Sequence, residues 1–553
     1  MKNLSRIQKI VLALLFLVIF VYSFRALNES DNFYHIKTGQ VIWETKSVPH
    51  QDVFSYTAVG AQWVTHEWLA ELVFYGIYTA FGFWGLMAFA AGVALISYSL
   101  LLRLALLKRA NFFISCILVV IIGIFTFKLW VVRPHIFGYL GLVILIWLLE
   151  KYRTRPRLFY LWLAAIDVLV WANMHASFIL GIVIMAFYGL AELLEIRWSN
   201  FFGKSHFAEK KWPLLLLLFA FLAGVLALVN PNTYRIFLYS FAVQPVAQAL
   251  HGYEWQPITF YFYETEVKLI LLEIIFFAAL AVFWFWTRKE NRNLTYLGLM
   301  LGASFMPFIS VRHNGLWSLL VFVPAAIAVS NIYEKRPCLL HTLPSLSAII
   351  LLLLFAGRAF ALPRSYFDKN FIPVYAVDFI EEHNLRGPIF NLVNEGGYLI
   401  WRLWPQEKIS IDSRSEVYIG KPLQEFLTVA RGGENWNYLV DEKYSINYFI
   451  FSYRPRVPGE SVIKLVQTLM RNNWVLVYWD DAAVIFVRNS KENKSLIDKY
   501  GLRHISPFRR PKDIPQKETA ETLNELNNLI KIVPNSDAVK EYQKLFLDSR
   551  SPL

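Results

Sequence analysis

Residues 10–24 read IVLALLFLVIFVYSF, and residues 339–361 read LLHTLPSLSAIILLLLFAGRAFA. Both runs approach or exceed the length that a helix needs to cross the apolar core of a bilayer. The whole chain has this character: 56% of its 553 residues are hydrophobic and 17% are charged, whereas about a quarter of a soluble domain is charged. The first run has no clear small-residue cleavage site and further apolar runs follow it, so we interpret it as a retained helix.

About eleven transmembrane helices are predicted by the apolar runs of this polytopic α-helical membrane protein. They lie near residues 8–27, 82–103, 111–127, 134–149, 158–172, 177–196, 213–230, 268–287, 294–309, 314–332 and 340–361. After Ala361 the composition becomes charged and mixed. We therefore predict three regions: a transmembrane domain over residues 1–361 that includes a first outward loop at 28–81, an α/β domain over 362–490, and a helical tail over 491–553.

Lysine and arginine are concentrated in alternate loops, and the intervening loops are richer in acids. Because basic loops stay in the cytoplasm, this alternation places the N-terminus inside the cell and, with an odd number of spans, the C-terminal domain outside. The net charge of +13 therefore reflects topology in the cell membrane rather than nucleic-acid binding. The two cysteines, Cys116 and Cys338, are far apart in the sequence and predict neither a disulfide framework nor a cysteine-based metal site.

Short strands and helices alternate after the last predicted span. Strands are predicted at 388–393, 408–412, 448–451, 474–478 and 483–487, and helices near 374–384, 420–430 and 460–471. The last two strands form a predicted hairpin, and the whole pattern favours an α/β domain. Gly396-Gly397-Tyr398 is too short for a nucleotide-binding loop and favours a turn between a strand and a helix.

Titratable side chains gather on the outward side of the predicted bundle. Such grouping at one face of an apolar bundle indicates a single functional site, although loop residues are also polar simply because they are solvated. Arginines at helix ends could hold a phosphate at headgroup depth, and snorkelling is the competing explanation for each of them. The outward set comprises Asp31, His35, His50, Asp52, His66, Glu67, Arg133, His135, Asn173, His175, Arg235, His251, Arg312 and His313.

The first outward loop contains two predicted amphipathic helices, one from Asn32 and one from Trp68, lying on the outer leaflet. Acid and imidazole groups stand at their starts, at Asp31 and at His66-Glu67. Such groups are the usual proton acceptors when a group is transferred to a hydroxyl or amine. Asp31 also fits the simpler role of capping the first helix, and the two roles are compatible.

Several motifs resemble a group of bacterial membrane proteins related to the GT-C glycosyltransferases, over roughly residues 10–490. The segment Gly396-Gly397-Tyr398 before Asp412-Ser413-Arg414 is also loosely similar to the acceptor-binding region of oligosaccharyltransferase catalytic subunits. The motifs lie at Asp31–Gly39, Pro49–Thr57, Trp63–Leu69, Arg133–His135, Trp171–His175, Asn230-Pro231, Glu254-Trp255, Arg312–Asn314, Asn391–Trp401 and Ile411–Arg414.

This resemblance implies an inverting transfer of a sugar from a polyprenyl-phosphate carrier to a glycan, lipid or protein acceptor outside the cytoplasm. By position after the first span, Asp31 is the implied base, and His66 with Glu67 is the second acid/base pair. Arg133, Arg235 and Arg312 are the expected phosphate contacts, with His35, His50, Asp52, His135, His175 and His313 lining the site. The sequence reads Asp31-Asn32 where many GT-C enzymes have paired acids, so dependence on a divalent metal stays open.

Two other functions stay open. A transporter or flippase of a lipid-linked intermediate usually shows two related halves and polar groups at mid-bilayer, whereas here we find no internal repeat and most polar groups lie at one end. The third hypothesis is a non-catalytic membrane scaffold that presents the outer domain.

Overall fold

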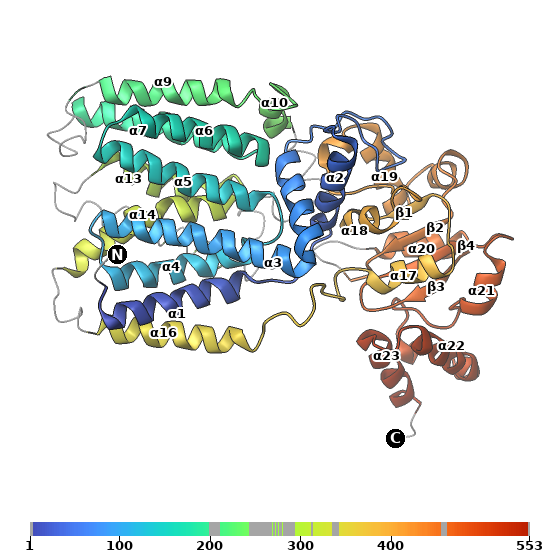
Figure 1. Cartoon of the computed structure of the whole chain (residues 1–553). Helices are drawn as coiled ribbons and strands as arrows, with labels where there is room; N and C mark the ends of the chain where they lie inside the picture. The colour runs from blue at the N-terminus through green and yellow to red at the C-terminus, as the bar shows by residue number, and fades with distance from the viewer. Residues whose placement is uncertain are drawn as a thin grey trace.

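The computed structural model describes residues 4–197, 209, 211–242, 293–310, 313–334, 342–454 and 462–550, with the isolated positions 268, 271, 275 and 279. Figure 1 shows two parts: a bundle of roughly parallel and antiparallel helices, and a small mixed sheet flanked by helices. Between them lie α2 (Asp31–Thr45) and the start of α3 (Trp68–Leu107). This arrangement places the first loop at the junction of the two parts.

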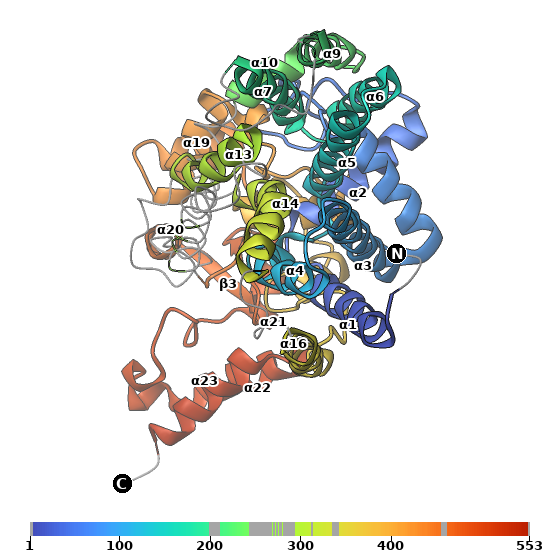
Figure 2. The same ribbon diagram turned by 90° about the vertical axis from the view of Figure 1, so that its left-hand side faces the viewer.

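The bundle consists, in the described residues, of helices that follow the predicted apolar runs. The predicted span at 268–287 lies almost entirely outside the described residues, and each of the other ten overlaps a helix. In both views α1 lies beside α16 (Figures 1 and 2). The helices are α1 (Arg6–Ser23), α3, α4 (Phe112–Thr126), α5 (His135–Thr154), α6 (Leu158–Met174), α7 (Phe178–Arg197), α9 (Lys211–Leu226), α13 (Leu294–Phe305), α14 (Asn314–Tyr333) and α16 (Leu343–Ala359).

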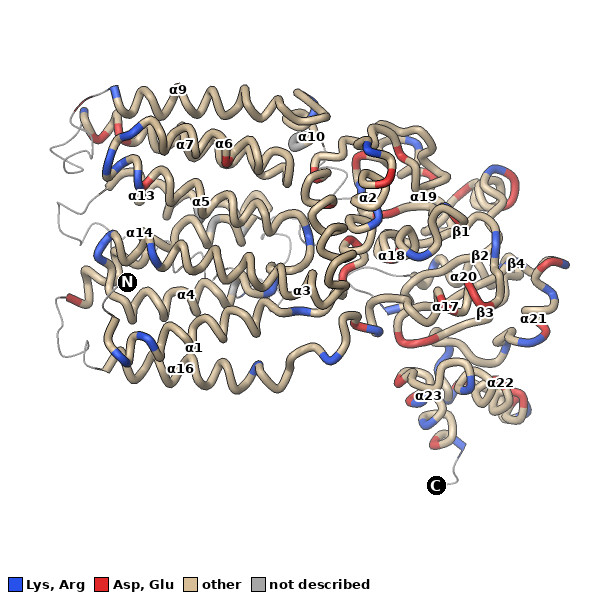
Figure 3. Tube along the Cα trace, viewed as in Figure 1, with Lys and Arg blue, Asp and Glu red and all other residues tan. Residues whose placement is uncertain are grey.

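The outside of the bundle is apolar, as a protein in lipid requires. Large hydrophobic side chains such as Trp162, Phe221 and Leu353 are exposed there. Among the described helices, α1, α3, α5 and α7 are long and apolar enough to cross a membrane, and shorter apolar helices lie within α4, α6, α9, α14 and α16. Lysines and arginines gather at the end of the bundle that is far from the sheet (Figure 3).

Helix α2 lies inside the protein rather than on its surface. The helix itself is where the sequence predicts it, but α3 and α18 (Val393–Leu403) both pack against it. Gly39 allows the close crossing with α3, because a Cβ there would lie 2.1 Å from the Glu71 carbonyl oxygen. Two other helices therefore cover α2, and its expected position at the outer leaflet stays a prediction. Gly82, with φ of 63°, separates the junction part of α3 from its bundle part.

The sheet has the strand order β1-β2-β4-β3, with β1 parallel to β2 and the other neighbours antiparallel. The predicted hairpin is confirmed as β3 and β4. The predicted strand at 408–412 is wrong, because Ile409 forms an isolated bridge with Ser55 of the first loop instead. The strands are β1 (Ile389–Asn391), β2 (Tyr448–Phe451), β3 (Trp474–Trp479) and β4 (Val484–Arg488). Besides α18, the helices after the bundle are α17 (Val374–Glu382), α19 (Lys421–Arg431), α20 (Ile463–Arg471), α21 (Lys494–Tyr500), α22 (Thr519–Ile532) and α23 (Asp537–Asp548).

Helix α18 docks on the start of α2 through a glycine. Gly396 and Gly397 were expected in a turn, but both lie within α18. A Cβ on Gly397 would lie 2.3 Å from the Ser30 carbonyl oxygen, and the Ser30 hydroxyl accepts the Tyr398 backbone N–H at 2.8 Å. Gly397 therefore allows close approach between the residues that begin α2 and the part that contains the sheet, which we call the small domain.

Candidate active site at the junction

Asp31, the first residue of α2, is held by a guanidinium. Arg133 places Nη2 2.8 Å from the Asp31 carboxylate and Nη1 2.8 Å from that of Glu29. Asn32 fixes this arrangement, because its side-chain amide donates to the Val132 carbonyl oxygen at 2.7 Å. Asp31 and Arg133 are each about five-sixths buried, with side-chain exposures of 17% and 16%. Two carboxylates therefore share one guanidinium at the start of α2.

The small domain reaches the same carboxylate. The Ser413 hydroxyl donates to Asp31 at 2.5 Å. Ser413 follows Asp412, and both stand in the segment after α18 that carries Ile409, bridged to the first loop. Asp31 is therefore contacted by a bundle residue and by a small-domain residue at once.

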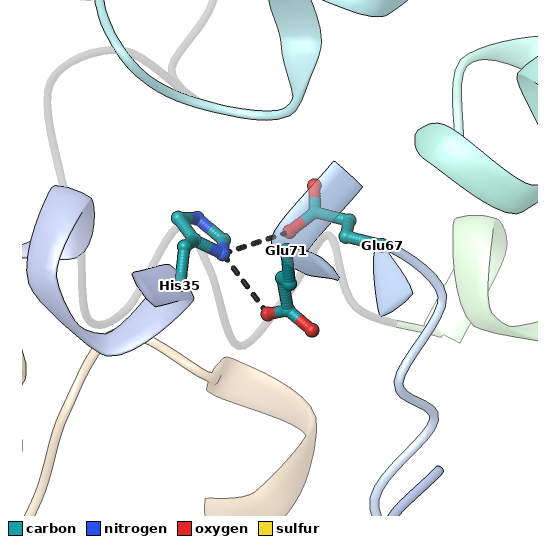
Figure 4. Close-up of side chains that lie close together, drawn as sticks. All are labelled: His35, Glu67 and Glu71. Atoms are coloured by element: carbon teal, nitrogen blue, oxygen red, sulfur yellow. Dashed lines mark hydrogen bonds and ion pairs between the residues drawn. The ribbon is translucent and has the colours of Figure 1, made fainter. Parts of the chain in front are cut away.

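A second group of ionisable side chains surrounds Glu67, the residue before α3. Glu71 lies one helical turn further along, on the same face. His35 Nδ1 lies 3.0 Å from Glu71 Oε1 and 3.7 Å from Glu67 Oε2 (Figure 4). On the other oxygen of Glu67, His66 Nε2 lies at 3.3 Å and His175 Nε2 at 3.7 Å. We call these five residues the Glu67 cluster.

Side-chain hydrogen bonds hold this part of the chain against the bundle. The Trp68 indole N–H donates to the Asn173 side-chain oxygen at 2.9 Å, and Asn230 donates to the same oxygen at 3.2 Å. Asn232 donates to the Thr65 carbonyl oxygen at 3.2 Å. The predicted motifs around residues 65, 173 and 230 thus meet in space.

The electrostatics of the cluster make His66 a cation. Burial alone would lower the pKa of His66, but Glu67 beside it raises that pKa to about 9. The geometry agrees, since Nδ1 donates to the Val64 carbonyl oxygen while Nε2 faces the carboxylate. Burial likewise opposes ionisation of Glu67, but His66 and the other imidazoles hold the pKa of Glu67 well below its usual range. The pair is an imidazolium and a carboxylate at neutral pH.

Two other carboxyl groups near the cluster shift in the opposite direction. Burial raises the pKa of Glu71, against the hydrogen bond from His35. Burial also raises the pKa of Glu416 to about 7, with the nearby Glu67 adding to the rise and His66 opposing it. The junction therefore contains carboxyl groups that ionise readily and carboxyl groups that resist ionisation, a pattern that is typical of active sites.

Asp52 has a different environment, in a buried ion pair between the first loop and the small domain. Its carboxylate lies 2.8 Å from Arg414 Nη2, and Arg414 also binds Asp412 at 2.6 Å. The guanidinium lies over the Trp63 ring, 4.4 Å from its centroid. This network holds Ser413, the neighbour of Arg414, in place against Asp31.

The remaining predicted site residues lie at varying distances from these groups. His135 contacts the Leu129 carbonyl oxygen at 2.6 Å, and its ring centroid lies 6.5 Å from that of His175. His50 is exposed and His313 precedes α14. Arg235 begins α10 (Arg235–Ala242) and is exposed. Arg312 and His251 lie outside the described residues.

Helix α10 connects the Glu67 cluster to an apolar groove. Its Tyr239 ring lies 4.1 Å from the His66 ring. On α10 two residues earlier, Phe237 lines a cavity of about 500 Å³ between α7 and α9, together with side chains such as Ile182, Phe221 and Val225. The groove and the Glu67 cluster therefore contact the same short helix, α10, through residues on different faces.

His35, Glu67 and Glu71 could also hold a metal ion. One potential ligand atom from each residue lies within 4.8 Å of the other two. Among the described residues, the sequence analysis did not select Glu71, Glu416 or Tyr239 for the site, and it named Ser413 only as part of the motif Asp412-Ser413-Arg414. The spacing of Glu71 four residues after Glu67 was the available signal for the first of these.

Comparisons with known proteins identify the fold. No protein-family model and no curated protein matches the chain. An oligosaccharyltransferase of Archaeoglobus fulgidus in its apo form has a TM-score of 0.55 and 12% identity, over 88% of this chain and 74% of that chain. The oligosaccharyltransferase AglB of that organism, in complex with an inhibitory peptide and a dolichol-phosphate, has a TM-score of 0.56 and 11% identity, over 99% and 87%.

A third structure, the Archaeoglobus fulgidus oligosaccharyltransferase in complex with Zn and sulfate, has a TM-score of 0.51 and 13% identity, over 97% and 83% of the two chains. At these identities the likeness concerns the fold, and it extends over nearly the whole length of this chain. The protein therefore has the fold of the archaeal oligosaccharyltransferase.

Proposed function

We propose that this protein is a membrane glycosyltransferase that moves a sugar from a polyprenyl-phosphate-linked donor to a glycan, lipid or protein acceptor outside the cytoplasm. The observation that carries the proposal is Asp31, whose carboxylate contacts Arg133 of the bundle and Ser413 of the small domain. The shared fold supports it, because one oligosaccharyltransferase structure of this fold contains a dolichol-phosphate and a peptide.

The distribution of charge supports an orientation with the N-terminus in the cytoplasm and the small domain outside. Basic residues gather at the end of the bundle far from the sheet (Figure 3). They include Lys108, Lys151, Arg155 and Lys211, at the ends of α3, α5 and α9. Because basic loops remain in the cytoplasm, the Asp31 site would face the exterior at the level of the lipid headgroups.

Arg133 is the proposed main contact for the donor phosphate. A guanidinium has five N–H donors, so a phosphate oxygen could share it with the Glu29 and Asp31 carboxylates. Arg235, at the start of α10, is proposed as a second contact, and Arg312 as a third. The apolar groove that ends at Phe237 of α10 would receive the polyprenyl tail, which places the phosphate next to α10 and the charged junction.

In the proposed inverting reaction, an acceptor hydroxyl or amine attacks the anomeric carbon from the side opposite the phosphate. The bond between that carbon and the phosphate oxygen breaks, and the phosphate leaves with the electron pair. Asp31 accepts the proton that the acceptor loses. The guanidinium of Arg133 and the imidazolium of His66, which Glu67 keeps charged, stabilise the negative charge on the leaving group.

The test compares cells that lack the gene with cells that carry the wild-type chain or Asp31→Asn. Mass spectrometry of surface glycans and glycoproteins should show a species that is lost on deletion and restored by the wild type. Asp31→Asn should restore it 100-fold less efficiently or worse, in line with the roughly 10²–10⁴-fold contribution of a general base. Unaltered glycoconjugates after deletion would contradict the enzyme, and full rescue by Asp31→Asn would remove Asp31 from the mechanism.

A further inference from the structure

The crossing of α2 and α3 brings an imidazole and two carboxylates into one enclosed space. His35 and Glu71 are 1% and 2% exposed, and the Glu67 side chain is 13% exposed. His35 Nδ1 is directed toward both carboxylates (Figure 4). The close crossing at Gly39 fixes this geometry, since Gly39 lies one turn after His35 and touches the Glu71 backbone.

Glu71 is incompletely satisfied in this arrangement. Its Oε2 is buried and has no hydrogen-bond partner among the described residues. A buried carboxylate oxygen without a partner is costly, because it has lost its hydration and gained no hydrogen bond in return. Glu67 lies one turn away on the same helical face, so a second carboxylate adds repulsion. Positive charge placed between the two acids would relieve both costs.

The atoms are spaced for a shared ion. Ligand atoms about 2.1 Å from one ion lie up to about 4.2 Å apart, and His35 Nδ1 already lies 3.0 Å and 3.7 Å from the two carboxylates. All three ligand atoms lie within 4.8 Å of one another, so a shift of under 1 Å in the side chains would complete the set. We propose that His35, Glu67 and Glu71 bind a divalent transition-metal ion.

The donor set indicates the class of ion. One imidazole nitrogen with two carboxylates suits Zn²⁺ or Mn²⁺, whereas Mg²⁺ favours oxygen ligands and keeps several waters. Asp31 is not part of this set, since its carboxylate is engaged by Arg133 and Ser413. The ion would offset the negative charge of Glu71 and part of that of Glu67, and it would tie α2 to α3.

The proposal concerns the site of the proposed function but does not rest on sugar transfer, because metal binding is measurable without any substrate. The competing arrangement keeps Glu71 protonated and shares its proton with His35 and Glu67. That arrangement predicts a protein that is equally stable with and without metal. The two differ in metal content and in response to added ions.

The experiment uses the full-length chain, purified in detergent through an affinity tag that contains no histidine. Elemental analysis should find about one equivalent of Zn²⁺ or Mn²⁺ per chain, removable by EDTA. Titration of ZnCl₂, MnCl₂ or MgCl₂ into the stripped protein should raise its unfolding temperature for the preferred transition metal. Glu71→Gln and His35→Gln should weaken that metal's affinity about 100-fold or more, because each removes a ligand.

Glu44→Gln is the matched control, since Glu44 is exposed at the end of α2 and hydrogen-bonds Gln40; it should bind metal as the wild type does. Equal unfolding temperatures of all variants in EDTA would show that they fold. Wild-type protein without bound metal that also gains no stability from the titrated ions would overturn the proposal, as would undiminished affinity in Glu71→Gln. Either result would leave the separate test on Asp31 unaffected.

Discussion

The Ser413 hydroxyl donates a hydrogen bond to the Asp31 carboxylate, although 382 residues separate the two in sequence. Asp31 begins α2, and Ser413 stands in the small domain after α18. The contact joins the two parts of the protein at the residue we propose as the base. Anything that displaces the small domain should therefore change the chemistry at Asp31 as well as stability.

Arg414→Met should destabilise the small domain by about 3–5 kcal/mol, because it leaves the buried Asp52 and Asp412 without their common cation. The rate of sugar transfer should also fall, because the ion pairs of Arg414 no longer hold the adjacent Ser413 against Asp31. Thermal unfolding and transfer assays on membranes would measure the two effects. Arg431→Met, at the exposed end of α19, is the control. If Arg414→Met were as stable as the wild type, the ion pairs of Arg414 with Asp52 and Asp412 would not be what holds the junction together.

Gly397→Ala should lower stability by about 1–3 kcal/mol, because the new methyl group would meet the Ser30 carbonyl oxygen at 2.3 Å and push α18 from α2. Gly76→Ala in α3, where nothing lies within 4 Å of the added Cβ, should instead stabilise by about 0.5–1 kcal/mol. Unfolding of both variants in detergent provides the comparison. Equal effects of the two substitutions would mean that α18 can move away without cost.

Asp480 predicts a pH dependence of stability. Burial raises the pKa of its carboxyl to about 6, although the backbone N–H groups of Ala483 and Ala482 oppose the shift. The folded state thus binds a proton that the unfolded state releases near pH 4, so the favourable contribution is present below pH 4 and is lost as pH rises through 6. The loss is at most about 3 kcal/mol.

Unfolding temperatures measured between pH 4 and pH 7 should therefore fall less steeply in Asp480→Asn than in the wild type. The exposed Asp498 supplies the control Asp498→Asn, whose curve should run parallel to that of the wild type. Parallel curves for Asp480→Asn as well would show that this carboxyl ionises at an ordinary pH in the fold.

The sequence predicted the helices of the bundle well, because lipid requires long apolar runs and internal backbone hydrogen bonds. It also selected Asp31, Arg133, His66, Glu67 and His175, all of which the structure brings to the junction. Charged and imidazole groups beside apolar spans are rare enough to be conspicuous. Their catalytic and phosphate-binding roles stay predictions until the variants are assayed.

Long-range packing was beyond what local pattern could predict. The spacing of α2 predicts a helix with one apolar face, yet α3 and α18 both cover it, and α18 comes more than 340 residues later. Gly396 and Gly397 resemble turn residues by composition, whereas their function is close approach to Ile411 and Ser30. Ser413 likewise becomes a site residue only through the docking of the two parts.

Arg133→Lys should reduce sugar transfer at least about tenfold, although it keeps the positive charge. A lysine presents one compact ammonium and cannot span the Glu29 and Asp31 carboxylates as the guanidinium does at 2.8 Å to each. Initial rates at varied donor concentration would separate a higher KM from a lower kcat. Arg358→Lys, in α16, is the control, and wild-type kinetics in Arg133→Lys would remove the guanidinium from donor binding.

Val225→Trp tests the groove between α7 and α9 as the place of the lipid tail. Val225 lines the groove and is 45% exposed, so a tryptophan there can fill the cavity without entering the packed interior. The KM for a long-chain polyprenyl donor should rise about tenfold or more, since a tail excluded from the groove loses the burial of several CH₂ groups at about 0.8 kcal/mol each. The kcat should change little, because Asp31 and Arg133 are untouched.

Leu218→Trp provides the matched control for the groove. Leu218 is on the same helix and is 49% exposed, but it does not line the groove. A donor with a shortened tail provides a second comparison. Because a short tail occupies less of the groove, the KM for this donor should differ less between Val225→Trp and the wild type. Should Leu218→Trp raise the KM as much as Val225→Trp, the effect would belong to the lipid-facing surface of α9 in general, and the tail would have to lie elsewhere on the bundle.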